Sequence, residues 1–306
     1  MSADAVFLVN PASANGSTAK RWPALQRRAR ELGLDGEALL SEGPGHLTEL
    51  ARGVSSDGRL VVVVGGDGTL NEVVNGLAGS AAEFAVLPNG TGQDFGRTHG
   101  IPTRFEEAVA VALGGESRSV DLGRAVFPGA EREQSRLFAN VGSVGMSGAV
   151  ARRANSMSKA LGGRATFFYA LIREFAAWKN TEVTVSLDGG ERRGRMHDVI
   201  LANGRWHGGG MKLAPDASPF DGLFDVVLIG DISKFDFATT SPMLYKGGHV
   251  RHPRVEVVRS ATVTVEAAVP LPFELDGEQC GTTPVRFEVI PAALRVRVPR
   301  SGPRAD

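Results

Sequence analysis

The 306-residue chain is 42% hydrophobic and 22% charged, a composition that excludes a fibrous or disordered protein. Its 34 basic and 34 acidic side chains cancel, which argues against nucleic acid as a partner. The single cysteine, Cys280, excludes an intrachain disulfide and suits a reducing cytoplasm, and every apolar run is far shorter than the roughly 20 residues of a transmembrane segment.

The first part of the chain alternates apolar strands with helices. Short apolar runs predict buried strands at 5–9, 60–64 and 84–87, and apolar residues at helical spacing predict helices at 20–32, 69–77 and 104–113. Strands that alternate with helices are typical of a parallel sheet. We therefore expect an α/β nucleotide-binding domain over residues 1–121.

The pattern changes near Ser119 to short alternating segments, which are typical of antiparallel strands. One helix is expected, over 164–178, where apolar residues recur at helical spacing. The result is a predicted β-rich domain for the lipid or other substrate over residues 122–290. The expected strands are 137–141, 181–187, 198–202, 224–229, 255–258, 261–266 and 285–289.

The strongest motif, VVVVGGDGTLNEVVNG at residues 61–76, is a buried strand that runs into glycines and then into a helix. Glycines allow the backbone to approach an anion, and the amides at a helix N-terminus favour negative charge. A nucleotide phosphate is the expected ligand. The loop lacks the Gly-Lys-Ser/Thr ending of a Walker P-loop and the spacing of the dinucleotide fingerprint. Taken alone, Gly-Asp-Gly is equally compatible with a tight turn.

The string Gly65-Gly66-Asp67-Gly68-Thr69 resembles a signature shared by diacylglycerol kinases, sphingosine kinases, NAD kinases and phosphofructokinases. Its continuation through Asn71, Glu72 and Asn75-Gly76 resembles the bacterial diacylglycerol kinase branch. Two further segments resemble nucleotide loops of that family, Asn10-Pro11-Ala12-Ser13-Ala14 and Leu87 to Arg97, although Ala14 replaces the usual Gly and Gln93 the usual Asn.

The second half carries more of the family's motifs, in the expected order: Ala202-Asn203-Gly204, Gly208 to Met211, Pro215 to Ser218, Asp221 to Val226 and Leu275 to Glu278. The resemblance implies an NAD kinase-like fold with two domains. These are an N-terminal Rossmann-like α/β domain and a C-terminal β-sandwich domain, with the active site in the cleft between them. The last segment, 291–306, is expected to return to the N-terminal domain and to end in a frayed tail.

The resemblance also implies roles for individual residues. Phosphoryl transfer needs aligned phosphates, a metal ion and a base near the acceptor hydroxyl. The implied ATP contacts are Asn10, Pro11, Ala12, Ser13, Ala14, Ser41, Gly66, Asp67, Gly68, Thr69, Leu70, Asn71, Glu72 and Thr91. Ser41 has an alternative interpretation as a loop or helix-cap residue.

Metal roles follow in the same way, with Mg²⁺ as the expected ion because hard cations prefer oxygen ligands. The implied structural metal ligands are Ser218 and Leu223 through backbone oxygens and Asp221 through its carboxylate, with Asp94 and Asp121 extending the network through water. Asp67 is the candidate for organising the catalytic Mg²⁺. The pairs Asp221-Gly222 and Asp276-Gly277 could each instead be a plain hairpin turn.

Either Asp276 or Glu278 is expected to be the general base that accepts the proton of the lipid hydroxyl. The sequence does not decide between them.

The resulting function is transfer of the γ-phosphoryl group of ATP to a lipid hydroxyl, with diacylglycerol the leading acceptor. The alternatives are an NAD kinase-like enzyme with a soluble acceptor and a non-catalytic nucleotide or lipid sensor. Arg152, Arg153, Lys159, Arg164 and Arg173 flank the aromatic helix at 164–178 and favour peripheral contact with an anionic membrane. A core-facing helix with a solvated basic side is the competing interpretation. We expect a cytoplasmic, peripherally membrane-associated protein, with a homodimer as a further possibility.

Overall fold

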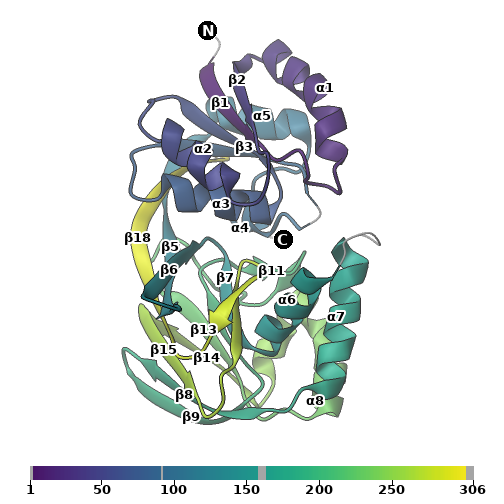
Figure 1. Cartoon of the computed structure of the whole chain (residues 1–306), viewed down its shortest axis with the longest axis vertical. Coiled ribbons are helices and arrows are strands. Elements are labelled where there is room, and N and C mark those ends of the chain that lie inside the picture. The colour runs from purple at the N-terminus through teal and green to yellow at the C-terminus, as the bar shows by residue number, and fades with distance from the viewer. Residues whose placement is uncertain (1–2, 91, 158–162, 301–306) are drawn as a thin grey trace. The chain divides into compact units, whose positions relative to one another are not determined.

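The computed structural model describes residues 3–90, 92–157 and 163–300 of the chain (Figure 1). The chain divides into two compact units, one formed by Met1–Asp121 with Ala292–Asp306 and the other by Leu122–Pro291. We call these the first unit and the second unit and describe each by itself. Two long strands, β5 (Glu116–Pro128) and β18 (Val285–Val298), contribute residues to both units.

The first unit is built on parallel strands in the order β2-β1-β3-β4, and the last part of β18 adds to β4 through Val296 opposite Phe84. The register places Val9 opposite Val64 and Gly65 opposite Pro88, so neighbouring strands end at one edge. The strands are β1 (Ala3–Val9), β2 (Leu34–Leu40), β3 (Leu60–Gly65) and β4 (Glu83–Pro88). The helices are α1 (Ser17–Glu31), α2 (His46–Val54), α3 (Asp67–Leu77), α4 (Asp94–His99) and α5 (Phe105–Gly114).

Helices cover both faces of this sheet, as the doubly wound arrangement requires. Trp22 of α1 and Ala108 of α5 pack with Phe7 on one face. Helices α2 and α3 lie on the opposite face (Figure 1). These two helices are in close contact at Gly76, where an added Cβ would lie 2.5 Å from the Thr48 carbonyl oxygen.

The second unit is a sandwich of two sheets. One sheet is antiparallel in the order β14-β13-β10-β7-β16-β17, and the other contains the first part of β18 with β15, β8, β9, β5 and β6. The strands are β6 (Glu133–Phe138), β7 (Val141–Gly145), β8 (Thr181–Leu187), β9 (Gly190–Met196), β10 (Asp198–Ala202), β13 (Phe224–Ile229), β14 (Val255–Ser260), β15 (Thr262–Ala267), β16 (Pro272–Leu275) and β17 (Glu278–Thr282). A short hairpin joins β11 (Trp206–His207) to β12 (Met211–Lys212).

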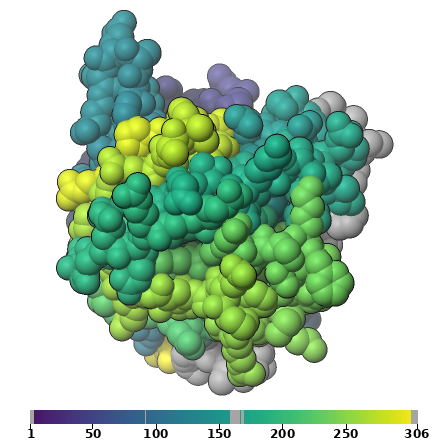
Figure 2. Space-filling model, turned by 90° about the horizontal axis from the view of Figure 1, so that it is seen from below, coloured from purple at the N-terminus to yellow at the C-terminus, as the bar shows by residue number. Residues whose placement is uncertain are grey.

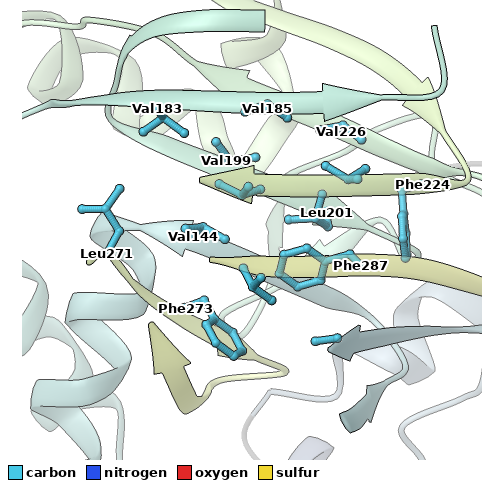
Figure 3. Close-up of a cluster of buried hydrophobic side chains, with 14 of the residues drawn as sticks. Val144, Val183, Val185, Val199, Leu201, Phe224, Val226, Leu271, Phe273 and Phe287 are labelled. Carbon is cyan, nitrogen blue, oxygen red and sulfur yellow. The ribbon is translucent and has the colours of Figure 1, made fainter. Parts of the chain in front are cut away.

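The core of the sandwich is filled by side chains from both sheets (Figure 3). Val199 and Phe273 come from one sheet, and Val185 and Phe287 from the other. Alternation along each strand sends every second side chain to this interior. Residues that fall between, such as Asp198 and Glu274, therefore lie on the other face of their sheet.

The helices of the second unit are α6 (Met146–Ser156), α7 (Gly163–Ala177) and α8 (Lys234–Thr240), followed by two 3-10 helices, η2 (Ser241–Lys246) and η3 (Gly248–Arg251). Helix α7 corresponds to the helix expected at 164–178. Lys159 lies outside the described residues, as do the side chains of Arg164, Phe167 and Phe168 and the tail from residue 301. Within the described chain, every helix is too short or too polar to span a membrane.

The strand expected at 137–141 is wrong. Strand β6 ends at Phe138 and β7 begins at Val141, so the chain leaves one strand and enters another. The amides of Ala139, Asn140 and Val141 all donate to the carboxylate of Asp276. A distant side chain thus satisfies backbone groups that a continuous strand would have paired with a neighbour.

Candidate active site

In the first unit, three loops meet at the carboxyl ends of β1, β3 and β4. The Asn10 amide donates to the Val64 carbonyl at 3.2 Å, and the Asn89 amide donates to the Gly65 carbonyl at 2.9 Å. An added Cβ at Gly90 would lie 2.6 Å from the Cα of Gly66, so the two loops touch backbone to backbone. Only glycine fits such an approach.

Side chains join the same loops. Asn10 Nδ2 donates to Thr69 Oγ1 at 3.0 Å, and its Oδ1 accepts from the Ala12 amide at 3.0 Å. Thr69 is buried and lies in the first turn of helix α3, which begins at Asp67 after Gly66. A helix N-terminus at the carboxyl edge of a parallel sheet, beside glycine loops, is suited to hold phosphate oxygens.

Asp67 holds the loop that precedes α4. Its Oδ1 accepts from the amides of Asp94 at 2.9 Å and Phe95 at 3.3 Å. Its Oδ2 occupies the space that a Cβ at Gly92 would need, and Asp94 Oδ2 is 3.7 Å from that same position. Two carboxylates therefore converge beside Gly92.

Other residues predicted to contact ATP are buried or form hydrogen bonds within the protein. Leu70 and Asn71 are buried in α3. Glu72 accepts from the Leu47 amide at 3.2 Å and so caps the start of α2. Ser41 follows β2 and donates from its Oγ to the Gly43 carbonyl at 2.9 Å, as its alternative interpretation as a loop residue anticipates. Thr91 lies outside the described residues.

The first loop is unusual in its backbone. Ala14 and Asn15 have φ values of 52° and 55°, in the left-handed region that favours glycine. This conformation accounts for the Gly that the family usually has at position 14. Gln93, with φ 60°, stands where the family usually has Asn, the residue other than glycine that tolerates this region best.

A polar network behind this loop was not predicted. Thr18 Oγ1 lies 2.5 Å from Ser13 Oγ and accepts from Asn89 Nδ2 at 2.8 Å, while Arg21 Nη1 donates to Asn89 Oδ1 at 3.4 Å. Thr18 and Asn89 are buried, and Arg21 is exposed. Thr18 and Asn89 are 71 residues apart in the sequence, so the sequence alone does not predict this contact.

In the second unit, the turn Asp276-Gly277 joins β16 to β17. Both residues have positive φ, 49° and 90°, so this is a two-residue hairpin turn, as the alternative interpretation holds. The Asp276 side chain does more than complete a turn. Its two oxygens accept the amides of Ala139, Asn140 and Val141 at 2.8, 2.9 and 3.0 Å.

Glu278, the next residue but one, pairs with Arg136 of β6, and about 40% of its side chain is exposed. The neighbouring Cys280 is half-buried, and burial raises the pKa of its thiol to about 11. The thiol is therefore protonated at neutral pH and is a poor nucleophile. Of the acidic groups at this turn, Glu278 is the one whose carboxylate is not committed to backbone amides.

Two carboxylates that the sequence did not suggest lie on the outer face of the same sheet. Glu274 is almost fully buried; it accepts from Ser143 Oγ and from the Gly277 amide, both at 2.6 Å, and lies 3.3 Å from His207 Nε2. Asp198 accepts from the amide of Ser147, at the start of α6. Burial raises the pKa of Asp198 to about 7, against the opposing hydrogen bonds from Ser147. The turn is thus fixed by Asp276 and Glu274 together.

Asn203 belongs to the same region, since its Nδ2 donates to the Ala139 carbonyl at 2.7 Å and its amide to the Asn140 carbonyl at 2.9 Å. The Ala202-Asn203-Gly204 motif therefore supports the segment that Asp276 binds. Asn140 is also buried, and its Oδ1 has no hydrogen-bond partner among the described residues.

The predicted structural metal ligands belong to both units. Asp221 Oδ1 accepts from the Leu223 amide at 3.2 Å and its Oδ2 pairs with Arg259, while Asp121 accepts from the Ala292 amide at 2.8 Å. Ser218 is half-buried near this block. Among the described residues, no three His, Cys, Asp or Glu side chains gather closely enough to hold a metal. The roles of Ser218, Asp221, Leu223, Asp94 and Asp121 as metal ligands therefore stay predictions.

Comparisons with known proteins agree with this picture. The diacylglycerol kinase catalytic domain matches residues 4–125, and the YegS C-terminal NAD kinase beta sandwich-like domain matches residues 140–298. A diacylglycerol kinase of Mycobacterium tuberculosis is 31% identical over 96% of this chain and 95% of its own, and one of Staphylococcus carnosus is 28% identical over 96% and 94%.

Solved structures show the same fold. A putative diacylglycerol kinase from Bacillus anthracis superposes with a TM-score of 0.76 over 96% of both chains at 21% identity. The yeast NADH kinase complexed with NADH gives a TM-score of 0.50 over 97% of this chain and 83% of its own, at 11% identity. These likenesses confirm the predicted fold class, an α/β domain followed by a β-sandwich-like domain.

The fold and the family models together define a two-domain kinase. More narrowly, the chain belongs to the diacylglycerol kinase family.

Proposed function

We propose that this enzyme transfers the γ-phosphoryl group of ATP to the free hydroxyl of diacylglycerol and so forms phosphatidic acid, a step of phospholipid biosynthesis. The carrying observation is the meeting of three glycine-bearing loops at the N-terminus of α3, joined by Asn10 and Thr69. This arrangement suits a polyphosphate. The named relatives support the lipid acceptor.

The proposed roles divide between the units. In the first unit, the loop 10–14 and the start of α3 bind the ATP phosphates through backbone amides. In the second unit, Glu278 accepts the proton of the acceptor hydroxyl. Asp276 is less suited to this role, because its carboxylate accepts hydrogen bonds from three backbone amides and protonation would weaken all three. Asp276 is then a positioning residue. This assignment makes Glu278 the choice from the two candidates.

Mg²⁺ fits the residues beside Gly92. Magnesium prefers one or two carboxylates together with substrate phosphates and water. Asp67 and Asp94 offer carboxylate oxygens that converge there, next to the loops proposed to bind phosphate. When bound, the ion would neutralise charge on the phosphates. These two residues would hold it, and removal of divalent cations with EDTA should abolish turnover that added Mg²⁺ restores.

The enzyme is proposed to be cytoplasmic and to act at a membrane surface, where its acceptor resides. A homodimer remains a prediction, which light scattering of the purified protein would test.

The test is transfer of label from [γ-³²P]ATP across a panel of acceptors in mixed micelles: diacylglycerol, phosphatidylglycerol, a sphingoid base and a polyprenol, with NAD as the soluble acceptor. We expect labelled phosphatidic acid as the main product. Labelling of NAD with none of any lipid would overturn the proposal in favour of the soluble-acceptor alternative. Binding of ATP with no transfer to any acceptor would favour the sensor.

A further inference from the structure

Large apolar side chains are exposed on one part of the second unit. Phe235 of α8 is 77% exposed, the highest value among the large hydrophobic residues that the structure describes as exposed. Others lie on α7 and η2: Tyr169 at 50%, Ile172 at 51%, Met243 at 43% and Tyr245 at 59%. These five account for most of the nine such residues. Exposed aromatic groups gathered on neighbouring elements mark a surface that meets something else.

Direct contacts join α7 to α8. The rings of Phe175 and Phe237 stack with centroids 4.6 Å apart, and Lys234 Nζ donates to the Ala176 carbonyl. Ile172 and Ala176 are four residues apart on α7 and so lie on one face. Lys234, which precedes Phe235 in α8, thus reaches the C-terminal end of α7. Helix η2 continues from α8, and Figure 2 shows this light-green segment on the surface toward the viewer.

The chain segment that contains α8 and η2 is also cationic. Between Ser233 and Arg254 the chain has four basic side chains, Lys234, Lys246, Arg251 and Arg254, and one carboxylate, Asp236. That carboxylate accepts from the Ser233 amide at 3.1 Å and from Ser233 Oγ at 2.7 Å within a capping box. These Ser233 hydrogen bonds, with smaller contributions from His252 and Arg254, lower the pKa of Asp236. His252 and Arg254 thus lie near the start of α8.

We propose that the surface formed by Tyr169 and Ile172 of α7, Phe235 and Lys234 of α8, and Met243, Tyr245 and Lys246 of η2 docks onto an anionic lipid bilayer. The proposal rests on the lipid-kinase function proposed above. Aromatic and aliphatic side chains flanked by lysines enter the headgroup region of a bilayer, and the lysines attract anionic headgroups. Charge complementarity therefore selects a bilayer with negative charge as the occupant.

Co-sedimentation of the full-length protein with vesicles tests the surface. The vesicles are phosphatidylcholine alone or phosphatidylcholine with phosphatidylglycerol, and the variants are Phe235→Ser with Tyr245→Ser and, separately, Lys234→Glu with Lys246→Glu. Val269→Ser is the matched control, because Val269 is 52% exposed elsewhere in the second unit. We expect wild type and the control to bind anionic vesicles, and each double variant to bind about tenfold more weakly.

Activity separates docking from chemistry. With long-chain diacylglycerol in vesicles, the double variants should lose activity in parallel with binding, while with a monomeric short-chain diacylglycerol they should match wild type within about twofold. Vesicle binding equal to wild type in both variants would overturn the docking surface. A loss of self-association instead of vesicle binding would do so as well and would assign the surface to a second copy. Wild type that binds vesicles but phosphorylates no diacylglycerol would refute the proposed acceptor alone.

Discussion

The candidate functional residues of the two units are held in different ways. In the first unit, the functional groups are backbone amides and side chains of short loops that follow adjacent parallel strands, and glycines such as Gly90 and Gly92 allow the loops to touch. In the second unit, two carboxylates of one hairpin hold its turn and the segment before β7, with Glu274 in β16 and Asp276 in the turn itself. A phosphate cradle can thus be built from contiguous motifs, whereas a positioned base depends on strand register.

The largest effect on stability is expected for Asp276→Asn. The amide group that replaces the carboxylate cannot accept all three backbone donors with charge assistance, and each such bond is worth about 1.5–3 kcal/mol. We expect the second unit to be destabilised by about 3 kcal/mol or more, as measured by urea denaturation. Glu133→Gln, at an exposed position of β6, is the control and should be neutral. An unchanged midpoint of urea denaturation for Asp276→Asn would show that this carboxylate does not hold the turn of the second unit.

Asp67→Asn should instead impair nucleotide handling. The variant weakens the hold on the Asp94 and Phe95 amides and removes a candidate magnesium ligand, while the sheet and its core stay intact. We expect kcat/KM for MgATP to fall by about 100-fold, a loss of about 2.7 kcal/mol of transition-state stabilisation. Steady-state kinetics at varied ATP and Mg²⁺ check this. A fall of less than threefold would remove Asp67 from the nucleotide site.

Protonation offers a third test, confined to the second unit. Burial raises the pKa of Asp198 from 3.8 to about 7, so the folded protein binds this proton more tightly than the unfolded chain. Stability from this group is complete below about pH 4 and is lost as pH rises to 7. His197 acts in the opposite sense, because burial lowers its pKa to about 4 and its contribution is lost as pH falls below 6.5.

The Asp198→Asn variant isolates the first effect. Between pH 5 and pH 8, the unfolding free energy of wild type should fall by about 3 kcal/mol more than that of the variant. The pH rises by about two units before it reaches the folded-state pKa of Asp198, and each unit is worth about 1.4 kcal/mol. Urea denaturation at both pH values measures the difference. Parallel curves for the two proteins would show that Asp198 does not titrate in this range.

The smallest effects concern the left-handed residues of the first unit. Ala14→Gly and Gln93→Asn place more tolerant residues at φ 52° and 60°. Each should raise the free energy of unfolding by up to about 1 kcal/mol. At position 14 the gain is smaller, because glycine also raises the conformational entropy of the unfolded chain. Thermal unfolding checks the sign. A loss of 1 kcal/mol or more from Gln93→Asn would mean that the Gln93 side chain, which donates to the Gly90 carbonyl, matters more than its backbone.

Sequence reasoning succeeded where neighbours in the chain are neighbours in space. The string Gly65 to Thr69 combines a strand end, a glycine loop and a helix start, so its physical meaning is local. The strands Thr181–Leu187, Asp198–Ala202 and Phe224–Ile229 occur where apolar alternation or apolar runs predicted them.

Failures have equally specific causes. Strand β9 is mostly polar because it is an exposed hairpin partner of β8, so no apolar pattern in the sequence predicts it. Glu274 and His207 are 67 positions apart, and Ser143 of β7 lies opposite Glu274 in the sheet. Arg136 pairs with Glu278 across 142 positions. Such contacts depend on register, which a single sequence does not display.

The most direct test of the account measures two quantities on Glu278→Gln. We expect ATP affinity, from equilibrium binding, to stay within about twofold of wild type, since Glu278 is assigned no contact with the nucleotide. Transfer of phosphate to diacylglycerol should fall by at least about 100-fold, in keeping with loss of a general base. Transfer within about tenfold of wild type would contradict the central claim that the first unit binds the nucleotide and Glu278 of the second unit serves as the base.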